Sequence, residues 1–415
     1  MKALHPVSSS PRGSITLLPD LSERKRHLEE RCLDIMKRWG YREVVTPIFE
    51  FLDVISKGVS QDLIEQGYKL TDRQSGRVMI IRPDVTPQIA RLATTSLKDI
   101  RPLRLSYALD VFRYEDSYGG RQREMLQLGA ELIGVGSPEG DVEVLLLLAD
   151  ILDEVGLEEY RFIVSHSDFL KGIINDCPEP VREDIVEIIK KKNLSRLEEL
   201  YHARFISKRL YSKLQRVLFL FGDKEVLKEA KSLCSNELSS QAIAMLQKFY
   251  KTFKKEPLAS RILFDLSEAE GLQYHSGIVF QVMDFDKNLN LGFGGRYDRM
   301  LRLFGLSDDT ATGFSLDAQA LLEASKLSVR TKKKTILYSG PIFNSLINGL
   351  RKRGYRVVYS YRKDRESLHK EAVRVCADHV LIGRPRGVYE IVFLPEGESR
   401  KVAEKEIFNI YEEVI

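Results

Sequence analysis

An amide and a carboxyl group, Gln127 and Glu131, stand four positions apart in a stretch of alternating polarity. On a β-strand their side chains point to the same side, with the small Gly129 between them. Arg113 and Glu115 have matching parity on the preceding strand. An acid and an amide can hold an ammonium group and an imidazole ring, and an arginine can hold a carboxylate or a phosphate in a bidentate fork. The same pattern also fits a solvated sheet face with surface ion pairs, and the spacing alone favours neither.

Two further segments contain residue types that chemistry uses. The segment 292–298 (GFGGRYD) places three glycines within four residues. Glycines in a strand permit close approach by a ligand or by another backbone, and for a lone glycine cluster tight packing is the favoured interpretation. The segment is not a GxGxxG followed by a helix, so it does not indicate a dinucleotide-binding fold. His275 is a lone histidine, which is more often structural than catalytic, and no Ser/His/Asp set is visible.

The elements that must position these residues follow from hydrophobic periodicity. Alternation over 103–111 and over 122–135 predicts two strands, joined as a hairpin through the loop 116–120. A helix is expected to start at Asp20, because Asp20 and Glu23 fit a capping box. Further helices are predicted at 141–156 and 315–325, and further strands at 262–266, 277–285 and 291–296.

The chain divides by pattern into a large and a small domain. Residues 1–325 form the larger one, with helical periodicity throughout an insertion at about 167–258. A polar and basic linker is expected at 326–334. Strand and helix patterns then alternate over 335–415, which predicts a small α/β domain with a mainly parallel sheet.

Composition narrows the class of protein. The chain has 415 residues and a net charge of +4, too near balance for a large nucleic-acid footprint. Its four cysteines form no CxxC pair, so we expect no metal site and no disulfide framework, as suits a reducing cytoplasm. The N-terminal residues have no apolar run typical of a signal peptide, and the longest apolar stretch, 144–149, is too short to span a bilayer. We therefore expect a cytoplasmic protein without membrane contact.

Four separated blocks resemble histidyl-tRNA synthetase, a class II aminoacyl-tRNA synthetase. The resemblance covers residues 1 to about 325 and implies an α+β fold: a class II synthetase-like antiparallel sheet flanked by helices, with a helical insertion. The blocks are GYREVVTPIFE (40–50), RPDVT (82–86), FRYE with GRQRE and QLGAE (112–115, 120–124, 127–131), and GFGGRYD with TGF (292–298, 312–314).

The resemblance carries roles over to individual residues. Family positions that hold the ammonium and the ring of histidine match Asp84, Thr86, Gln127 and Glu131. Arg113 matches a contact to the ATP α-phosphate and to the carboxylate, and Arg121 matches an ATP-contacting loop arginine. Asp84 replaces a glutamate and is one methylene shorter.

Two departures remove cations that adenylation needs. The family's RGLDYY segment becomes EGLQYH, so Glu270 replaces a catalytic arginine, and His275 replaces a tyrosine. Ala320 occupies the place of an arginine that grips ATP. Phosphoryl and adenylyl transfer depend on cations that stabilise developing negative charge, each by several kcal/mol. We therefore expect no adenylation activity and no catalytic residues.

This pattern of losses, together with Tyr274 and His275, is similar to the regulatory subunits of short-form ATP phosphoribosyltransferase. That resemblance implies a regulatory subunit for the first step of histidine biosynthesis, with histidine as effector and Arg121 as a vestigial nucleotide contact. It further implies a short-form catalytic partner, a homodimer core within a hetero-octamer, no cofactor and no tRNA. The small C-terminal domain resembles a reduced anticodon-binding domain. Two alternatives remain: a divergent histidyl-tRNA synthetase, and a free-standing module that senses uncharged tRNA.

Overall fold

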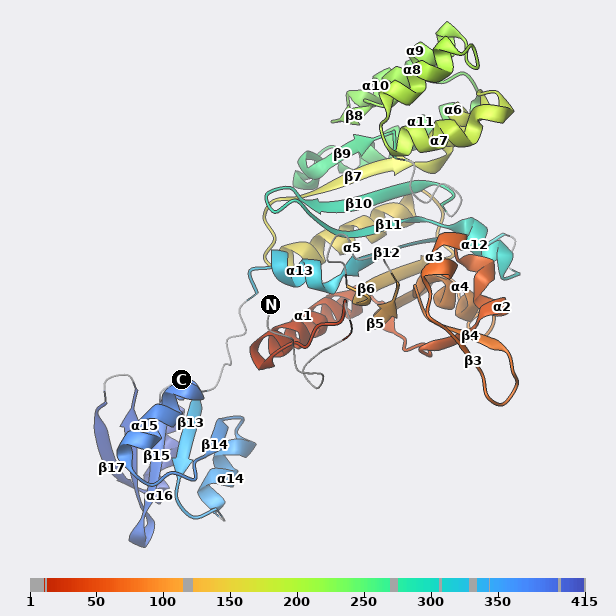
Figure 1. Ribbon diagram of the computed structural model, residues 1–415. Helices are drawn as coiled ribbons and strands as arrows, with labels where there is room; N and C mark the ends of the chain where they lie inside the picture. Colours follow the sequence, from red (N-terminus) through yellow and green to blue (C-terminus); the bar gives the residue numbers. More distant parts are fainter. Residues whose placement is uncertain are drawn as a thin grey trace, which may run out of the picture. The chain divides into compact units, whose positions relative to one another are not determined.

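The computed structural model describes residues 11, 13–114, 122–268, 275–305, 308–327, 334–342, 344–394 and 397–413. The chain forms two compact units, residues 1–328 and 329–415. Figure 1 shows both units.

A nine-stranded, mainly antiparallel sheet is the framework of the first unit. Only its β1–β5 and β7–β9 pairs are parallel. The strands follow in the order β1 (Arg42–Glu43), β5 (Leu103–Phe112), β6 (Glu124–Ile133), β12 (Ala311–Asp317), β11 (Leu289–Arg296), β10 (Ile278–Asp284), β7 (Tyr160–His166), β9 (Ile262–Asp265) and β8 (Phe221–Gly222). The expected hairpin of two long strands is confirmed as β5 and β6.

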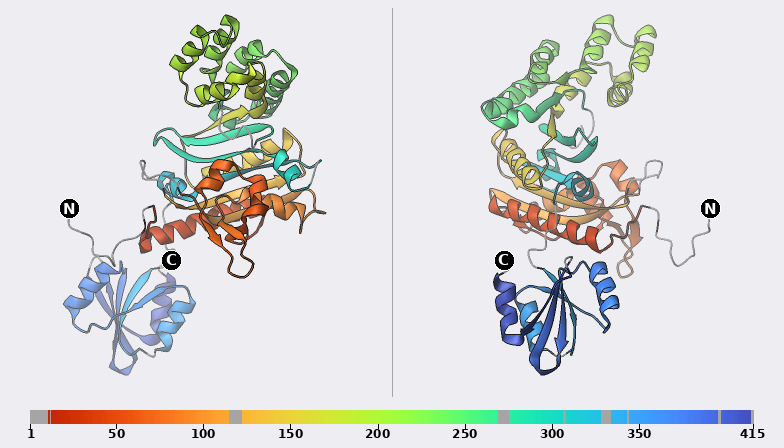
Figure 2. Two further views of the ribbon diagram at one scale, coloured as in Figure 1. Left: turned by 45° about the vertical axis from the view of Figure 1, so that its right-hand side comes forward. Right: turned by 90° about the vertical axis from the view of Figure 1, so that its left-hand side faces the viewer.

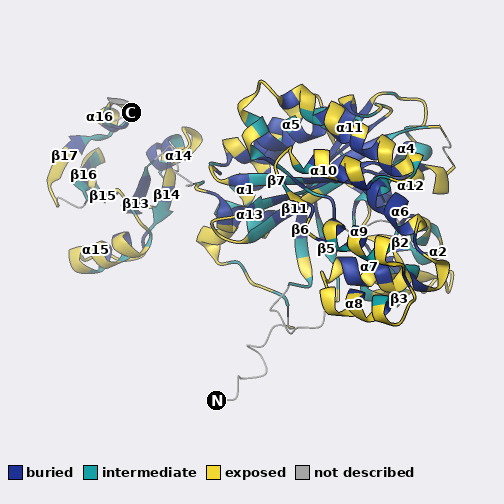
Figure 3. Ribbon diagram, turned by 90° about the horizontal axis from the view of Figure 1, so that it is seen from above, coloured by how far each residue is buried: buried dark blue, intermediate teal, exposed yellow. Residues whose placement is uncertain are grey.

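Helices cover both faces of this sheet. One face packs its leucines against α1 (Pro19–Arg38), α5 (Glu139–Glu154) and α13 (Ala318–Ala324). The other face forms a smaller core with α4 (Thr86–Thr94) and α12 (Asp298–Leu303). Buried and exposed residues both occur along α5, as expected for helices that lie on a sheet (Figure 3). A small sheet of β2 (Phe49–Phe51), β4 (Val78–Ile81) and β3 (Lys69–Thr71) lies beside α2 (Leu52–Ile55), η2 (Ser56–Gly58) and α3 (Gln61–Gln66).

A helical insertion separates β7 from β9 in the sequence. Its helices gather at one end of the sheet, beyond these two strands (Figure 2). They are α6 (Ser167–Asn175), η3 (Glu179–Val181), α7 (Arg182–Lys190), α8 (Leu194–His202), α9 (Lys208–Val217), α10 (Val226–Leu233), α11 (Glu237–Phe253) and η4 (Pro257–Arg261). The expectation of helix throughout needs one correction, because the insertion also contributes the short edge strand β8.

Two other expectations were wrong in detail, and one strand was missed. Helix α1 begins at Pro19, and no side chain caps it, so the capping box at Asp20 is not formed. Proline suits the first turn of a helix because a backbone N–H at that position would have no helical partner. The predicted helix 315–325 begins only at Ala318, because residues 315–317 belong to strand β12. Strand β7 was not predicted as a strand.

The second unit is an α/β domain around a five-stranded sheet. Its elements are β13 (Thr335–Ser339), α14 (Ser345–Lys352), β14 (Arg356–Tyr359), α15 (Arg365–Arg374), β15 (His379–Arg384), η5 (Pro385–Gly387), β16 (Val388–Phe393), β17 (Ser399–Ala403) and α16 (Glu404–Glu413). The order is β14-β13-β15-β16-β17. The β14–β13–β15 pairs are parallel and the β15–β16–β17 pairs antiparallel, so the sheet is mixed rather than mainly parallel.

Candidate ligand-binding site

Strand β6 carries the predicted amide and acid on a face that is buried. Gln127 is 8% exposed and Glu131 is 1% exposed. Their neighbours Leu128 and Ala130 point to the other side and belong to the large core. A solvated sheet face is therefore excluded at these positions, and the two polar side chains form the floor of an interior site.

Glu131 is the most deeply buried ionisable group of this floor. The hydroxyl of Thr86 donates to its Oε1 at 2.8 Å, and the hydroxyl of Tyr297 donates to its Oε2 at 2.6 Å. The hydroxyl of Tyr107 lies 3.4 Å from Oε1. Burial raises the pKa of Glu131 to about 8, although all three hydroxyl groups favour the charged form. A cationic group placed against this carboxyl would lower its pKa, so the site is suited to an ammonium group or a protonated ring.

The space in front of Glu131 exists because the facing strand position has no side chain. Gly313 on β12 pairs with Glu131, and a Cβ at Gly313 would lie 1.8 Å from Oε2. On the next strand, β11, Gly295 is paired with Gly313. The resulting cavity measures about 140 Å³ and is lined by Asp84, Thr86, Glu131, His275, Phe293, Gly294, Gly295, Tyr297, Gly313, Phe314 and Ser315. A cavity of roughly this size holds a benzene-sized ring.

Residues at the start of helix α4 link the buried Glu131 to Arg113 through hydrogen bonds. One carboxylate oxygen of Asp84 accepts the Thr86 N–H at 2.9 Å, and the other accepts from Arg113 Nη2 at 3.1 Å. Arg113 Nε also donates to the Pro83 carbonyl at 2.7 Å. The amide oxygen of Gln127 lies 3.4 Å from the backbone nitrogen of Val85. Residues from two of the four sequence blocks therefore meet at one helix start.

His275 lines the same small cavity. Its Nδ1 lies 3.3 Å from the carbonyl oxygen of Arg296. Burial lowers the pKa of His275 to about 4, so the imidazole is neutral at physiological pH. If Nδ1 donates its proton to this carbonyl, Nε2 is an acceptor. The ring then offers a ligand a lone pair rather than a charge.

The structure thus brings together six of the residues proposed from the sequence: Asp84, Thr86, Arg113, Gln127, Glu131 and His275. Tyr274 and Arg121 lie outside the described residues, as do Glu115, Glu270 and Gln273.

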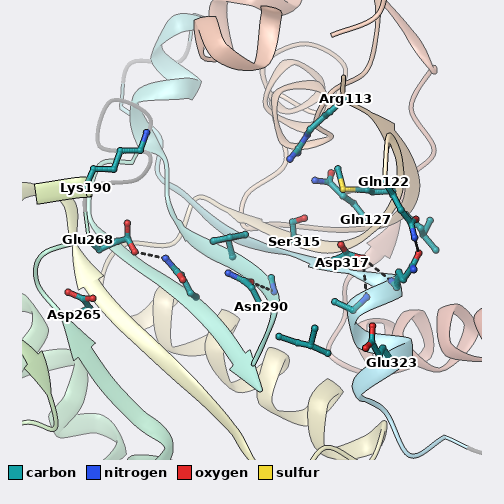
Figure 4. A pocket seen from close by; sticks show the side chains of 18 of the residues that line it. Arg113, Gln122, Gln127, Lys190, Asp265, Glu268, Asn290, Ser315, Asp317 and Glu323 are labelled. Carbon is teal, nitrogen blue, oxygen red and sulfur yellow. Dashed lines mark hydrogen bonds between the residues drawn. The ribbon is translucent and has the colours of Figure 1, made fainter. Parts of the chain in front are cut away.

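A larger cavity of about 660 Å³ adjoins the small one, and Phe293 and Ser315 line both. Arg113 and Gln127 lie on one side of it, and Lys190 and Glu268 lie on the other (Figure 4). Its described lining contains the cations Arg113, Lys190 and Lys192 and the carboxylates Asp265, Glu268, Asp317 and Glu323. Lys192 is paired with Asp265 at 3.1 Å. Ala320, where the synthetase family has an arginine, also lines this cavity and adds no positive charge.

Sequence reasoning missed Tyr297, Tyr107 and Gly313. In the hairpin, Tyr107 is paired with Gly129, so its side chain lies on the same face of the sheet as Gln127 and Glu131. The sequence alone does not give this pairing, because the register depends on the length of the connecting loop. Tyr297 is the last residue but one of the glycine-rich segment 292–298, whose glycines pack against the neighbouring strands: a Cβ at Gly294 would lie 2.3 Å from the Phe280 ring. This outcome agrees with the tight-packing interpretation of that segment.

The described residues contain neither a metal-binding cluster nor a membrane-spanning helix. No group of three or more His, Cys, Asp or Glu side chains is arranged to hold a metal ion there. No helix in the described part of the chain has both the length and the apolar character needed to cross a membrane.

Comparison with known proteins places this fold and site in a class. A family model described as Histidyl-tRNA synthetase matches residues 13–321. A histidyl-tRNA synthetase from Nostoc sp. PCC 7120 has a similar fold, with a TM-score of 0.78 over 98% of this chain and 99% of that one at 18% identity. The protein therefore has a histidyl-tRNA synthetase-like, class II α+β fold, as expected from the sequence.

Closer relatives define the family within that class. The ATP phosphoribosyltransferase regulatory subunit of Syntrophotalea carbinolica is 31% identical, covering 84% of each chain, and that of Moorella thermoacetica is 36% identical over 76% of this chain and 81% of the relative. A structure described as an ATP phosphoribosyltransferase regulatory subunit/histidyl-tRNA synthetase from Bacillus halodurans has a TM-score of 0.78 and 27% identity, covering 89% of this chain and 97% of that one. This chain belongs to the family of ATP phosphoribosyltransferase regulatory subunits.

Proposed function

We propose that this chain is a non-catalytic regulatory subunit that senses histidine for a short-form ATP phosphoribosyltransferase, in the first step of histidine biosynthesis. Its family membership supports the regulatory role. The single observation that carries the histidine assignment is the buried Glu131 carboxyl, which faces a ring-sized cavity and is held by the hydroxyl groups of Thr86 and Tyr297.

The contacts around the cavity suit the three polar parts of a free amino acid. The imidazole ring would lie against Glu131. The ammonium group would be held by Asp84, Thr86 and Gln127, all at the start of α4 or beside it. Arg113, turned toward Asp84 at 3.1 Å, would take the carboxylate in a charge-assisted hydrogen bond. Tyr274 and His275 complete the proposed set.

The charges of the larger cavity support the absence of adenylation. Four carboxylates and three cations line its described part, and the alanine at position 320 supplies no replacement for the missing arginine. A triphosphate placed there would meet net negative charge where a synthetase needs cations to stabilise the transition state. We therefore assign the chain no catalytic residue of its own.

Regulation would follow from linkage between the two subunits. Histidine that binds one state of the complex more tightly shifts the equilibrium toward that state, and the catalytic partner changes activity with it. We further propose a homodimer as the core of a hetero-octamer. Val45 (78% exposed) and Phe49 (47% exposed) lie in the block 40–50 that resembles histidyl-tRNA synthetase, and these exposed apolar side chains support a contact there.

The test combines this chain with a short-form catalytic subunit and measures phosphoribosyl transfer against histidine concentration. We expect this chain to raise turnover and to confer inhibition by histidine. Thr86→Val removes a hydroxyl group that donates to Glu131, so inhibition should need roughly tenfold more histidine, the effect of losing one hydrogen bond to a charged group.

Thr95→Val is the matched control. Its hydroxyl, at the exposed end of the same helix, donates to the Arg91 carbonyl at 2.7 Å and touches no part of the site. Inhibition of this variant should equal that of the unmodified complex. A chain that neither changes turnover nor confers inhibition would show the proposed function to be wrong.

The second candidate is a divergent histidyl-tRNA synthetase, which the match to the synthetase family model favours. Histidine-dependent exchange of pyrophosphate into ATP separates the two candidates. We expect no exchange from this chain, and robust exchange would make it a synthetase.

A further inference from the structure

The segment 275–277 is anchored by residues of three neighbouring elements. On one side, the Ser276 N–H donates to the Arg296 carbonyl at 2.9 Å, and the Ser276 hydroxyl accepts the Asp298 N–H at 2.8 Å. On the other side, the Ser167 N–H donates to the Gly277 carbonyl at 2.9 Å. The first two contacts come from β11 and the residue that opens α12, whereas the third comes from the first turn of α6 in the helical insertion.

Lys171 makes the second contact from the insertion, and it reaches the ligand-facing residue itself. Its ammonium group donates to the His275 carbonyl at 2.7 Å, across 104 positions of sequence. The side chain is 17% exposed and lies 3.4 Å from the carboxylate of Asp168. Burial lowers the pKa of Lys171, and Asp168 opposes this effect. A charge held this far from water gives a strong and directional hydrogen bond.

The helix that carries Lys171 is fixed to the rest of the insertion. Asn236 caps helix α11 with its side-chain oxygen and donates from Nδ2 to the Gly172 carbonyl of α6 at 2.8 Å. A Cβ at Gly172 would lie 2.8 Å from atoms of both Asn236 and Ser239, so the two helices are in close contact. A shift of α11 therefore moves α6, and with it Lys171.

We propose that Lys171 is a positioning residue that holds His275 in the ligand site and couples that site to the helical insertion. Because the backbone of His275 is tied to α6, ligand occupancy and the position of the insertion depend on one another. The effect on histidine affinity rests on the proposed function, whereas the effect on the segment 275–277 does not.

The variants compare two similar lysines of the insertion. Lys171→Met keeps the length of the side chain and removes its charge, and Lys171→Arg restores a charged donor. The control is Lys213→Met on α9. Lys213 is 14% exposed and pairs with Asp176 at 2.7 Å, so its loss removes a comparable ion pair. Its described contacts are to Asp176 and Ser235 and include no atom of the ligand site.

The first readout is hydrogen exchange at the Ser276 amide in the protein without histidine. We expect Lys171→Met to exchange about tenfold faster than the unmodified chain, with Lys171→Arg between them and Lys213→Met unchanged. Equal acceleration by Lys171→Met and Lys213→Met would indicate general loosening of the insertion and overturn the proposal. Unchanged exchange in Lys171→Met would also overturn it.

The second readout is histidine affinity by calorimetry. We expect Lys171→Met to bind histidine about tenfold more weakly and Lys213→Met to bind it as the unmodified chain does. Faster exchange with unchanged affinity would overturn the coupling. If the unmodified chain binds no histidine, the proposed sensing function fails, while the exchange readout still decides whether Lys171 positions the segment.

Discussion

Replacing Glu131 with glutamine should remove a pH dependence of stability that this buried carboxyl creates. Burial raises the pKa of Glu131 from its usual value near 4.5 to about 8. Between these values the unfolded chain carries a carboxylate whereas the folded chain carries a protonated carboxyl, so stability falls as pH rises. Each pH unit inside this window costs about 1.4 kcal/mol. From pH 5.5 to 7.5 the unmodified chain should therefore lose about 3 kcal/mol relative to Glu131→Gln, and the difference should level off above pH 8.

The assay is denaturant unfolding at a series of pH values without histidine, followed by tryptophan fluorescence. Trp39 is the only tryptophan of the chain and belongs to the first unit, so its signal reports the unit that contains Glu131. Subtracting the two stability curves removes titrations that both proteins share, and a constant offset from the amide does not affect the slope. Parallel curves between pH 5.5 and 7.5 would refute the inference that Glu131 is protonated in the folded chain.

Three further predictions concern the site and the second unit. Gly313→Ala places a Cβ 1.8 Å from Glu131 Oε2, so histidine binding should fall at least a hundredfold by calorimetry and stability by about 1–3 kcal/mol; normal binding would contradict the geometry of the cavity. Histidine bound at pH 7 should carry a protonated ring, because the imidazole takes the proton that Glu131 loses; the carbon-13 shifts of isotope-labelled histidine should show an imidazolium in the unmodified chain and a neutral ring in Glu131→Gln. Asn344→Ala removes the cap of α14 and two donated hydrogen bonds, which should destabilise the second unit by about 2 kcal/mol in hydrogen exchange and leave the Trp39 transition unchanged.

The hairpin that carries Gln127 and Glu131 could be predicted because its strands alternate. One face of β6 supplies leucine and alanine to a large core, and the other face supplies polar and small residues to the site. A period of two is a strong signal when the two faces have different surroundings. The sequence did not reveal that the polar face is interior, since α4 and its neighbours cover it only in the folded chain.

The missed strands lacked this contrast. Strand β12 lies between β6 and β11 in the middle of the sheet, and most of its residues are buried whichever way they point. Its last residues precede α13 without a break, so the helical pattern was extended back to position 315. Because Gly313 is on this strand, missing β12 also meant missing the position that makes room beside Glu131. In the second unit, the sequence before β17 did not indicate an antiparallel pairing, so the mixed sheet was not predicted.

The small cavity beside Glu131 exists because Gly313 has no side chain, which fixes the direction in which mutation can change its specificity. Any substitution at Gly313 adds atoms beside Glu131, so drift at this position can exclude ligands and cannot admit larger ones. A broader specificity would require substitutions that remove atoms from other residues lining this cavity, such as Phe293, Phe314 or Tyr297. Selection for a different effector should therefore leave Gly313 unchanged and act on these aromatic residues.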